Sequence, residues 1–175
     1  LNLIHTGGPE DIKSAEDNWK RTFVFIAILI AIPVISGYGF NFLINENLMI
    51  DALLNLSVAL CFIVVAILMK LKKGNALKLY RMSSAGLILL LVYNIGFGPH
   101  GESEALWLLL FPLFAFYLFG MKEGGAWVGL LILPSAMFLF FPDIFHSSAY
   151  PVKFRISLAI AMILSVFVSL LLESL

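Results

Sequence analysis

Long runs of apolar residues recur along this sequence, and they constrain its fold more than any other feature. A helix that crosses a bilayer core about 30 Å thick needs ~20 consecutive apolar residues. Hydrophobic residues make up 61% of the 175-residue chain and charged residues 13%, whereas soluble domains are about 45–50% apolar. Because lipid covers such a surface and water does not, the sequence predicts an all-α, polytopic membrane protein.

Six segments are apolar enough to count as membrane helices, which predicts a six-transmembrane-helix bundle. They run over residues 22–44, 49–69, 82–98, 104–120, 126–141 and 152–172, of which the third to fifth are the shortest. The connections between them are short, so consecutive helices are expected to be antiparallel neighbours. We expect residues 1–19 to be a cytoplasmic segment and residues 20–175 the transmembrane domain of a longer protein.

The positive charges predict the orientation of the chain. Nine of the eleven Lys and Arg residues lie before the first segment or in the second and fourth connections. The other two, Lys153 and Arg155, lie at the head of the sixth segment. Because cytoplasmic loops carry the excess of Lys and Arg, both termini are expected in the cytoplasm.

Polar residues near the outer ends of the predicted helices form a candidate ligand site, while the middle of every helix is free of charge. Arg155 would bind an anionic ligand, or pair with Asp51, Glu102 or Glu104 when the site is empty. An apolar cavity with one cation at its mouth suits a fatty acid or another amphiphile. The structural alternatives are an interfacial aromatic belt for Tyr and Trp and snorkelling for Arg155. The candidate ligand-binding residues are Arg155, Trp107, Tyr93, Asn94, Asp51 and His100.

No enzyme motif with a catalytic spacing is present in the sequence. His100 and His146, with Glu102 or Glu104, would make an external metal site, but ordinary loop histidines are the favoured interpretation. The single cysteine, Cys61, allows no disulfide within one copy of the chain. We therefore predict no catalytic residue, no metal and no cofactor, and nucleic acid is not an expected partner.

Residues 105–124 resemble the fourth helix of the six-helix N-terminal sensor domains of bacterial diguanylate cyclases (GGDEF proteins) and some sensor histidine kinases. The start of the sixth segment, from Tyr150 to Arg155, is similar to the aromatic-then-Arg entry of that family, which adds Tyr150 to the candidate ligand-binding residues. The resemblance covers about the last hundred residues. The matching residues of the fourth helix are Trp107, Phe111, Pro112, Gly120, Lys122 and Gly124.

This resemblance implies a homodimeric sensory or input domain in the bacterial inner (plasma) membrane. Such a domain would bind a small hydrophobic or amphiphilic ligand on the outer leaflet side. It would signal through the sixth helix to a C-terminal cytoplasmic diguanylate cyclase or histidine kinase, so catalysis would fall outside this chain. The alternatives are a small transporter or channel-like protein, a lipid enzyme built on Arg155, Asp51 and His100, and an anchor that dimerises a partner domain. Two observations argue against a transporter: the middle of each predicted helix carries no charged residue, and the sequence has no internal repeat.

Overall fold

The computed structural model describes residues 9–46, 48–71, 75–97, 106–145 and 150–174, and every regular element in these ranges is helical. The all-α prediction is therefore confirmed. Five stretches are long and apolar enough to cross a membrane, which supports a membrane protein: Ser14–Ile44, Met49–Lys70, Ala76–Phe97, Trp107–Phe140 and Val152–Leu172. The elements are α1 (Pro9–Asn41), η1 (Phe42–Glu46), α2 (Met49–Lys70), α3 (Ala76–Phe97), η2 (Leu106–Leu109), α5 (Phe111–Phe140), α6 (Pro142–Phe145) and α7 (Val152–Ser174).

The first of two compact units, Leu1–Tyr80, is built on the pairing of α1 with α2. Arg21 of α1 donates from Nε and Nη2 to the main-chain oxygen of Met69, at 3.2 and 3.0 Å. That oxygen lies in the last turn of α2, where carbonyls lack intrahelical donors and the helix dipole favours a cation. Toward the other end of α1, a Cβ on Gly39 would lie 2.9 Å from Leu56 Cγ, so the two helices approach closely there.

α1 is longer than a membrane span. Its 33 residues correspond to about 50 Å at 1.5 Å per residue. The expected boundary between a cytoplasmic segment 1–19 and the transmembrane domain therefore falls inside one continuous helix. Near that boundary Lys20 pairs with Glu16 at 2.7 Å, one turn apart on the same helix face.

The second unit, Arg81–Leu175, holds most of α3 and all of η2, α5, α6 and α7. α5 lies alongside α7, and η2 contacts both. The apolar core of this unit is formed by residues of α3, η2, α5 and α7 together with Tyr150. Its members are Ile88, Leu91, Ile95, Leu108, Phe111, Ala115, Phe116, Val128, Leu131, Leu139, Tyr150, Leu158 and Met162.

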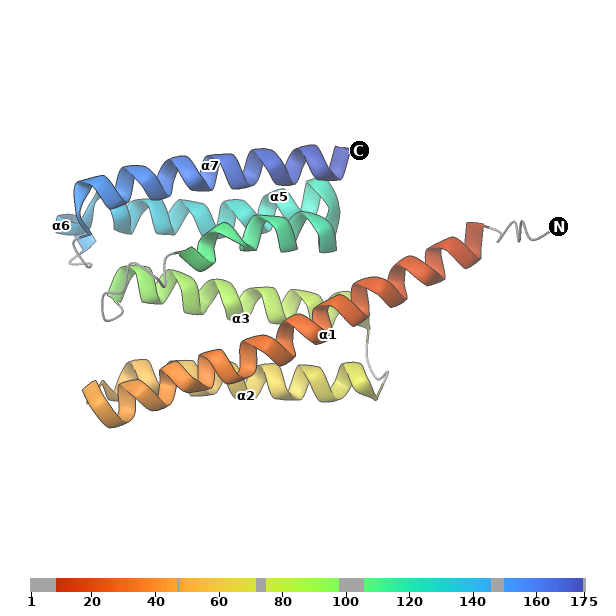
Figure 1. The fold of residues 1–175 in the computed structure, drawn as a ribbon, viewed down its shortest axis with the longest axis horizontal. Coiled ribbons are helices and arrows are strands. Elements are labelled where there is room, and N and C mark those ends of the chain that lie inside the picture. Colours follow the sequence, from red (N-terminus) through yellow and green to blue (C-terminus); the bar gives the residue numbers. More distant parts are fainter. Residues whose placement is uncertain (1–8, 47, 72–74, 98–105, 146–149, 175) are drawn as a thin grey trace. The chain divides into compact units, whose positions relative to one another are not determined.

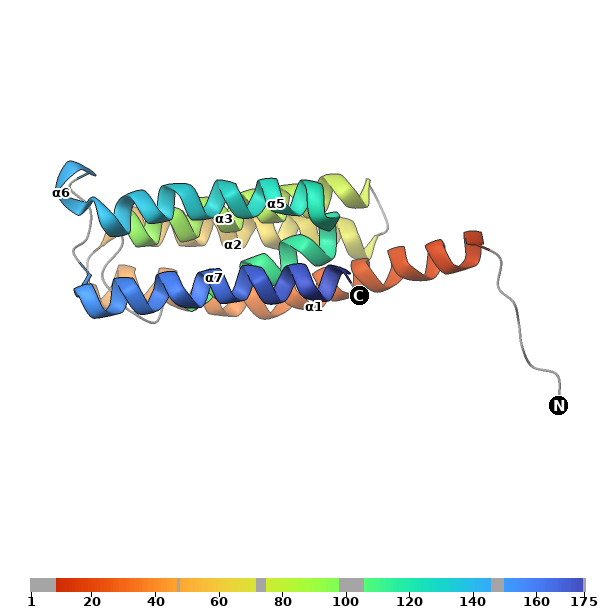
Figure 2. The ribbon, with the colours of Figure 1, turned by 90° about the horizontal axis from the view of Figure 1, so that it is seen from above.

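The chain reverses its direction inside α5. Gly120 has φ 70° and ψ 179°, which interrupts the helix. A Cβ on Gly124 would lie 2.8 Å from the main-chain oxygen of Ala115, although nine residues of continuous helix would separate these positions by about 14 Å. α5 is therefore a hairpin (Figures 1 and 2), with a first limb over residues 106–119, η2 included, and a second limb over residues 121–140.

The described first limb spans roughly 21 Å over about fourteen residues, which is less than a bilayer core of about 30 Å. Near its start, the hydroxyl of Ser165 in α7 donates to the main-chain oxygen of Leu109. Ser165 lies ten residues, or about 15 Å, along α7 from Arg155. The described part of the fourth predicted segment, 104–120, therefore begins about halfway along α7.

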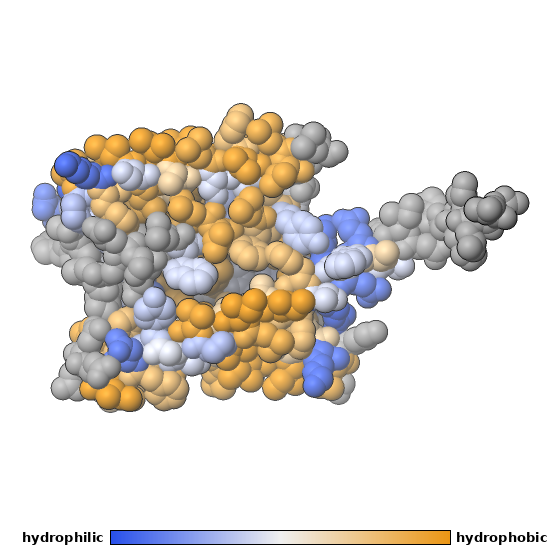
Figure 3. Space-filling view, in the orientation of Figure 1, coloured by the Kyte–Doolittle hydropathy of each residue, from blue (hydrophilic) through white to orange (hydrophobic). Residues whose placement is uncertain are grey.

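Apolar side chains cover most of the visible sides of the helices, and the strongly hydrophilic residues gather near the helix ends (Figure 3). Ile30, Leu133 and Ile163 are 60%, 68% and 70% exposed. Such side chains are unfavourable in water and favourable in lipid. These exposed apolar faces are consistent with a membrane protein.

Candidate functional site

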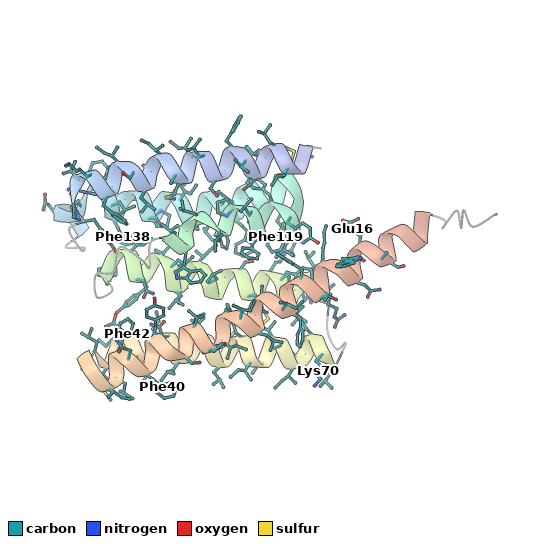
Figure 4. The ribbon with its side chains drawn as sticks, viewed as in Figure 1. Glu16, Phe40, Phe42, Lys70, Phe119 and Phe138 are labelled. Carbon is teal, nitrogen blue, oxygen red and sulfur yellow. The ribbon has the colours of Figure 1, made fainter. Side chains whose placement is uncertain are left out.

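Polar side chains make contacts at both ends of the second unit. Phe119 lies near one end and Phe138 near the other (Figure 4). At the first, called the Glu123 end, Arg81 at the start of α3 binds both carboxylate oxygens of Glu123, at 2.7 and 2.8 Å. Trp127 Nε1 also donates to Glu123, at 3.2 Å, and the Trp127 ring stacks on Phe119. This bidentate ion pair links α3 to the second limb of α5, at Glu123, three residues after the reversal at Gly120.

At the opposite end, called the Arg155 end, α3, α5 and α7 meet. The rings of Phe97 and Phe138 contact edge to face at 5.3 Å, and Tyr93 packs against Phe97 at 5.9 Å. A Cβ on Gly96 would lie 3.0 Å from Phe138, so α3 and α5 approach closely here. Helix α7 joins them because Arg155 Nη1 donates to the main-chain oxygen of Leu139 at 3.1 Å.

Arg155 is half-buried and keeps unused hydrogen-bonding capacity. Its bond to Leu139 lies in the last turn of α5, where a cation interacts favourably with the helix dipole. Its Nε is buried and has no partner. The ion pairs in the described part of the chain are Lys20–Glu16 and Arg81–Glu123, so Arg155 pairs with no described carboxylate.

Two more unpaired polar atoms lie about one helical turn before Phe97 and Leu139. Asn94 Oδ1 is buried without a partner, three residues before Phe97 on α3. Ser135 is 0% exposed and its hydroxyl is also unpaired, four residues before Leu139 on α5. Three of the four unpaired buried side-chain atoms found among the described residues thus belong to the Arg155 end.

Ser135 differs from other hydroxyl residues of the helices. Thr22, Ser57 and Ser169 each donate to the main-chain oxygen four residues earlier, at 2.9, 2.7 and 2.6 Å. Ser135 makes no such bond although it is fully enclosed. Its neighbour Pro134 has no N–H, so the carbonyl of Leu130 has also lost its helical donor. Sequence reasoning missed Ser135; the signal was a hydroxyl directly after a proline in an apolar span.

The predicted site residues are placed as follows. Tyr93, Asn94 and Arg155 lie at the Arg155 end of the second unit, and Tyr150 joins them because its ring stacks on Phe154 at 5.4 Å. Trp107 lies in η2, two residues from Leu109, and is 43% exposed. It is therefore about halfway along the unit and not beside Arg155.

Asp51 belongs to the first unit, so its expected grouping with Arg155 stays a prediction. It is 6% exposed on α2, and Oδ1 of its carboxylate is unpaired. Asn55, four residues later, is 1% exposed and donates from Nδ2 to the main-chain oxygen of Asp51 at 2.8 Å. The two share one buried helix face, as their spacing predicts.

His100 lies outside the described residues, as do the other three members of the alternative metal site, His146, Glu102 and Glu104. Within the described ranges, no group of three His, Cys, Asp or Glu residues could hold a metal ion. In comparisons with known proteins, no protein-family model, no curated protein and no solved structure matches this chain.

Proposed function

We propose that this chain is a membrane-embedded sensory domain that binds a small hydrophobic or amphiphilic ligand at the Arg155 end. The observation that carries the proposal is the half-buried guanidinium of Arg155, which has an unpaired Nε and no described carboxylate partner. A half-buried cation at the end of apolar helices attracts an anionic head group, and the surrounding apolar side chains suit an alkyl chain. Both features fit an amphiphile such as a fatty acid.

The proposed topology has six crossings, with both termini in the cytoplasm of the bacterial inner membrane. In this topology the two limbs of the α5 hairpin belong to the fourth and fifth crossings, and the described first limb covers only part of the bilayer. The ion pair between Arg81 and Glu123 supports this arrangement, because it ties the start of α3 to the turn between the limbs. The Lys and Arg distribution then puts the Glu123 end inside and the Arg155 end outside.

Labelling of single cysteines tests this topology. Cys61→Ala first removes the native thiol. Each test variant then carries one new thiol at an exposed position, introduced by Asp17→Cys, Lys122→Cys or Asp143→Cys. A membrane-impermeant maleimide added to intact cells should label position 143 alone. It should label positions 17 and 122 in inside-out vesicles. Labelling of position 122 on neither side would mean that α5 crosses the bilayer once, and the proposed orientation of the C-terminus would then be wrong.

The path for a signal runs along α7. This helix extends without interruption from Val152 to Ser174. Its head carries the ligand-facing Arg155, and its other end would lead to the C-terminal cytoplasmic effector, either a diguanylate cyclase or a histidine kinase. A ligand bound at the Arg155 end would change the hydrogen bond from Arg155 to the main-chain oxygen of Leu139. It would either weaken this bond by competing for the guanidinium or strengthen it by holding the guanidinium in place. Such a change would shift α7 against α5, and a homodimer would pass the shift to a dimeric effector.

Binding of dodecanoic acid to the purified chain in phosphatidylcholine nanodiscs tests the role of Arg155. The Arg155→Met variant, which keeps the apolar stem, should bind about tenfold to a hundredfold more weakly, since one charge-assisted hydrogen bond is lost. Lys153→Met is the matched control because it removes the same charge from an exposed position two residues earlier. The proposal fails if Arg155→Met binds as the unmodified chain does, or if Lys153→Met loses as much affinity.

A further inference from the structure

Ser135, Asn94 and Arg155 come from three different helices of the second unit, and each has a buried polar atom without a partner. More than about nine in ten buried polar groups in proteins are hydrogen-bonded, so three exceptions at one end of one unit require a cause. Ser135 and Leu139 are one turn apart on α5, and Leu139 binds Arg155. Asn94 and Phe97 are one turn apart on α3, and Phe97 contacts Phe138. Ser135 and Asn94 therefore each lie about one helical turn deeper in the unit than the level at which Arg155 binds Leu139.

The default bond of a serine in an apolar helix is available to Ser135 but is not made. Ser169, at 2% exposure in the same unit, donates to its own helix, whereas Ser135 at 0% does not. Ser135 and Ser169 therefore differ in hydrogen bonding although both are almost completely buried. An enclosed hydroxyl without a partner is costly, and a bound group that accepts from it or donates to it would remove that cost.

We infer that Ser135, Asn94 and Arg155 form one buried polar site for the head group of the ligand, and that this head group carries both a hydrogen-bond donor and an acceptor. The inference rests on the proposed function. It adds to that function the position of the head group within the helices and the chemical class of the ligand. Arg155 Nε only donates and therefore needs an acceptor, such as a carboxylate oxygen. Asn94 Oδ1 only accepts and therefore needs a donor, and Ser135 serves either role. An alkanoic acid with a hydroxyl near its carboxylate meets all three requirements, whereas a plain alkanoate leaves Asn94 unpaired.

A matched pair of ligands tests the inference, with both affinities measured on the purified chain in phosphatidylcholine nanodiscs. 3-Hydroxydodecanoic acid should bind roughly fivefold more tightly than dodecanoic acid, the difference that one neutral hydrogen bond makes. Asn94→Leu, which removes the acceptor for the hydroxyl of the ligand, should abolish this preference, and Ser135→Ala should weaken the binding of 3-hydroxydodecanoic acid. Ser169→Ala, whose hydroxyl is already paired, should keep the preference.

The thermal midpoint without ligand gives an independent readout. Ser135→Ala should leave the midpoint unchanged or raise it, by up to about 2 to 4 °C, since it removes an unpaired hydroxyl. Ser169→Ala should lower the midpoint because it removes a formed bond. A lower midpoint for Ser135→Ala together with an unchanged affinity for 3-hydroxydodecanoic acid would mean that the hydroxyl has a structural partner such as water, and the inference would be overturned.

The outcomes separate this inference from the proposed function. Equal binding of both acids, with Arg155→Met still defective, would overturn the buried head-group site and leave the sensory proposal standing. Failure of both acids to bind the unmodified chain would overturn the two together.

Discussion

Replacing Gly124 by alanine should lower the free energy of unfolding by about 1–3 kcal/mol, the usual cost of overpacking a tight contact. The new Cβ would lie 2.8 Å from the main-chain oxygen of Ala115 and 2.9 Å from Phe116 Cα. Both of these atoms belong to the backbone of the first limb, so no flexible side chain can move aside. The two limbs of the α5 hairpin would have to separate. Titration of the purified chain with sodium dodecyl sulfate, followed by circular dichroism, measures the change.

Gly129 is the matched control for this substitution. It lies on the same limb of α5, and a Cβ there would meet nothing within 4 Å. Gly129→Ala should therefore leave stability unchanged or raise it by about 0.5–1 kcal/mol, because alanine is the better helix former. Equal stabilities for the two alanine variants would show that the limbs are not in close contact at Gly124.

The second large effect is expected at Gly120, where the backbone turns. Its φ of 70° and ψ of 179° lie in a region that is essentially restricted to glycine. Gly120→Ala should cost about 1–3 kcal/mol through backbone strain alone. A further consequence is expected for topology, because the strain is relieved if the two limbs straighten into one helix. Maleimide labelling of Lys122→Cys in inside-out vesicles should then decrease along with stability.

Gly37→Ala serves as the control for Gly120→Ala. Gly37 lies within α1, its φ is not positive, and a Cβ there would meet nothing within 4 Å. Its replacement should leave labelling at position 122 unaffected. If Gly120→Ala unfolds like the unmodified chain and labels equally, the turn does not depend on the conformation of Gly120.

Several elements were predictable from residue type alone. The second predicted segment, 49–69, became α2 over Met49–Lys70, and the sixth, 152–172, became α7 over Val152–Ser174. These boundaries follow from local chemistry, since an apolar run ends where charged or turn residues begin. The likeness to sensor domains of cyclases and kinases stays a prediction.

The candidate site was predictable in part. Tyr93, Asn94, Tyr150 and Arg155 were identified because polar residues are conspicuous at the ends of apolar helices, and the structure places all four at one end of the second unit. Ser135 was missed because serine in an apolar helix normally bonds to its own backbone. Its missing partner becomes visible only when every hydrogen bond around it is known.

Apolar composition thus predicted helices that are long and apolar enough to span a membrane, and the approximate limits of most of them. The sequence also predicted the fourth and fifth segments as separate antiparallel helices, and the reversal at Gly120 agrees with that division. It did not establish where the described first limb lies along α7, or where Arg155 binds. Lipid covers an apolar helix whatever its neighbours are, so hydropathy does not determine how the helices pack together. That information lies in contacts between residues far apart in sequence, such as Ser165 with Leu109 and Arg81 with Glu123. Those contacts depend on how the helices are packed, which no local pattern of residues encodes.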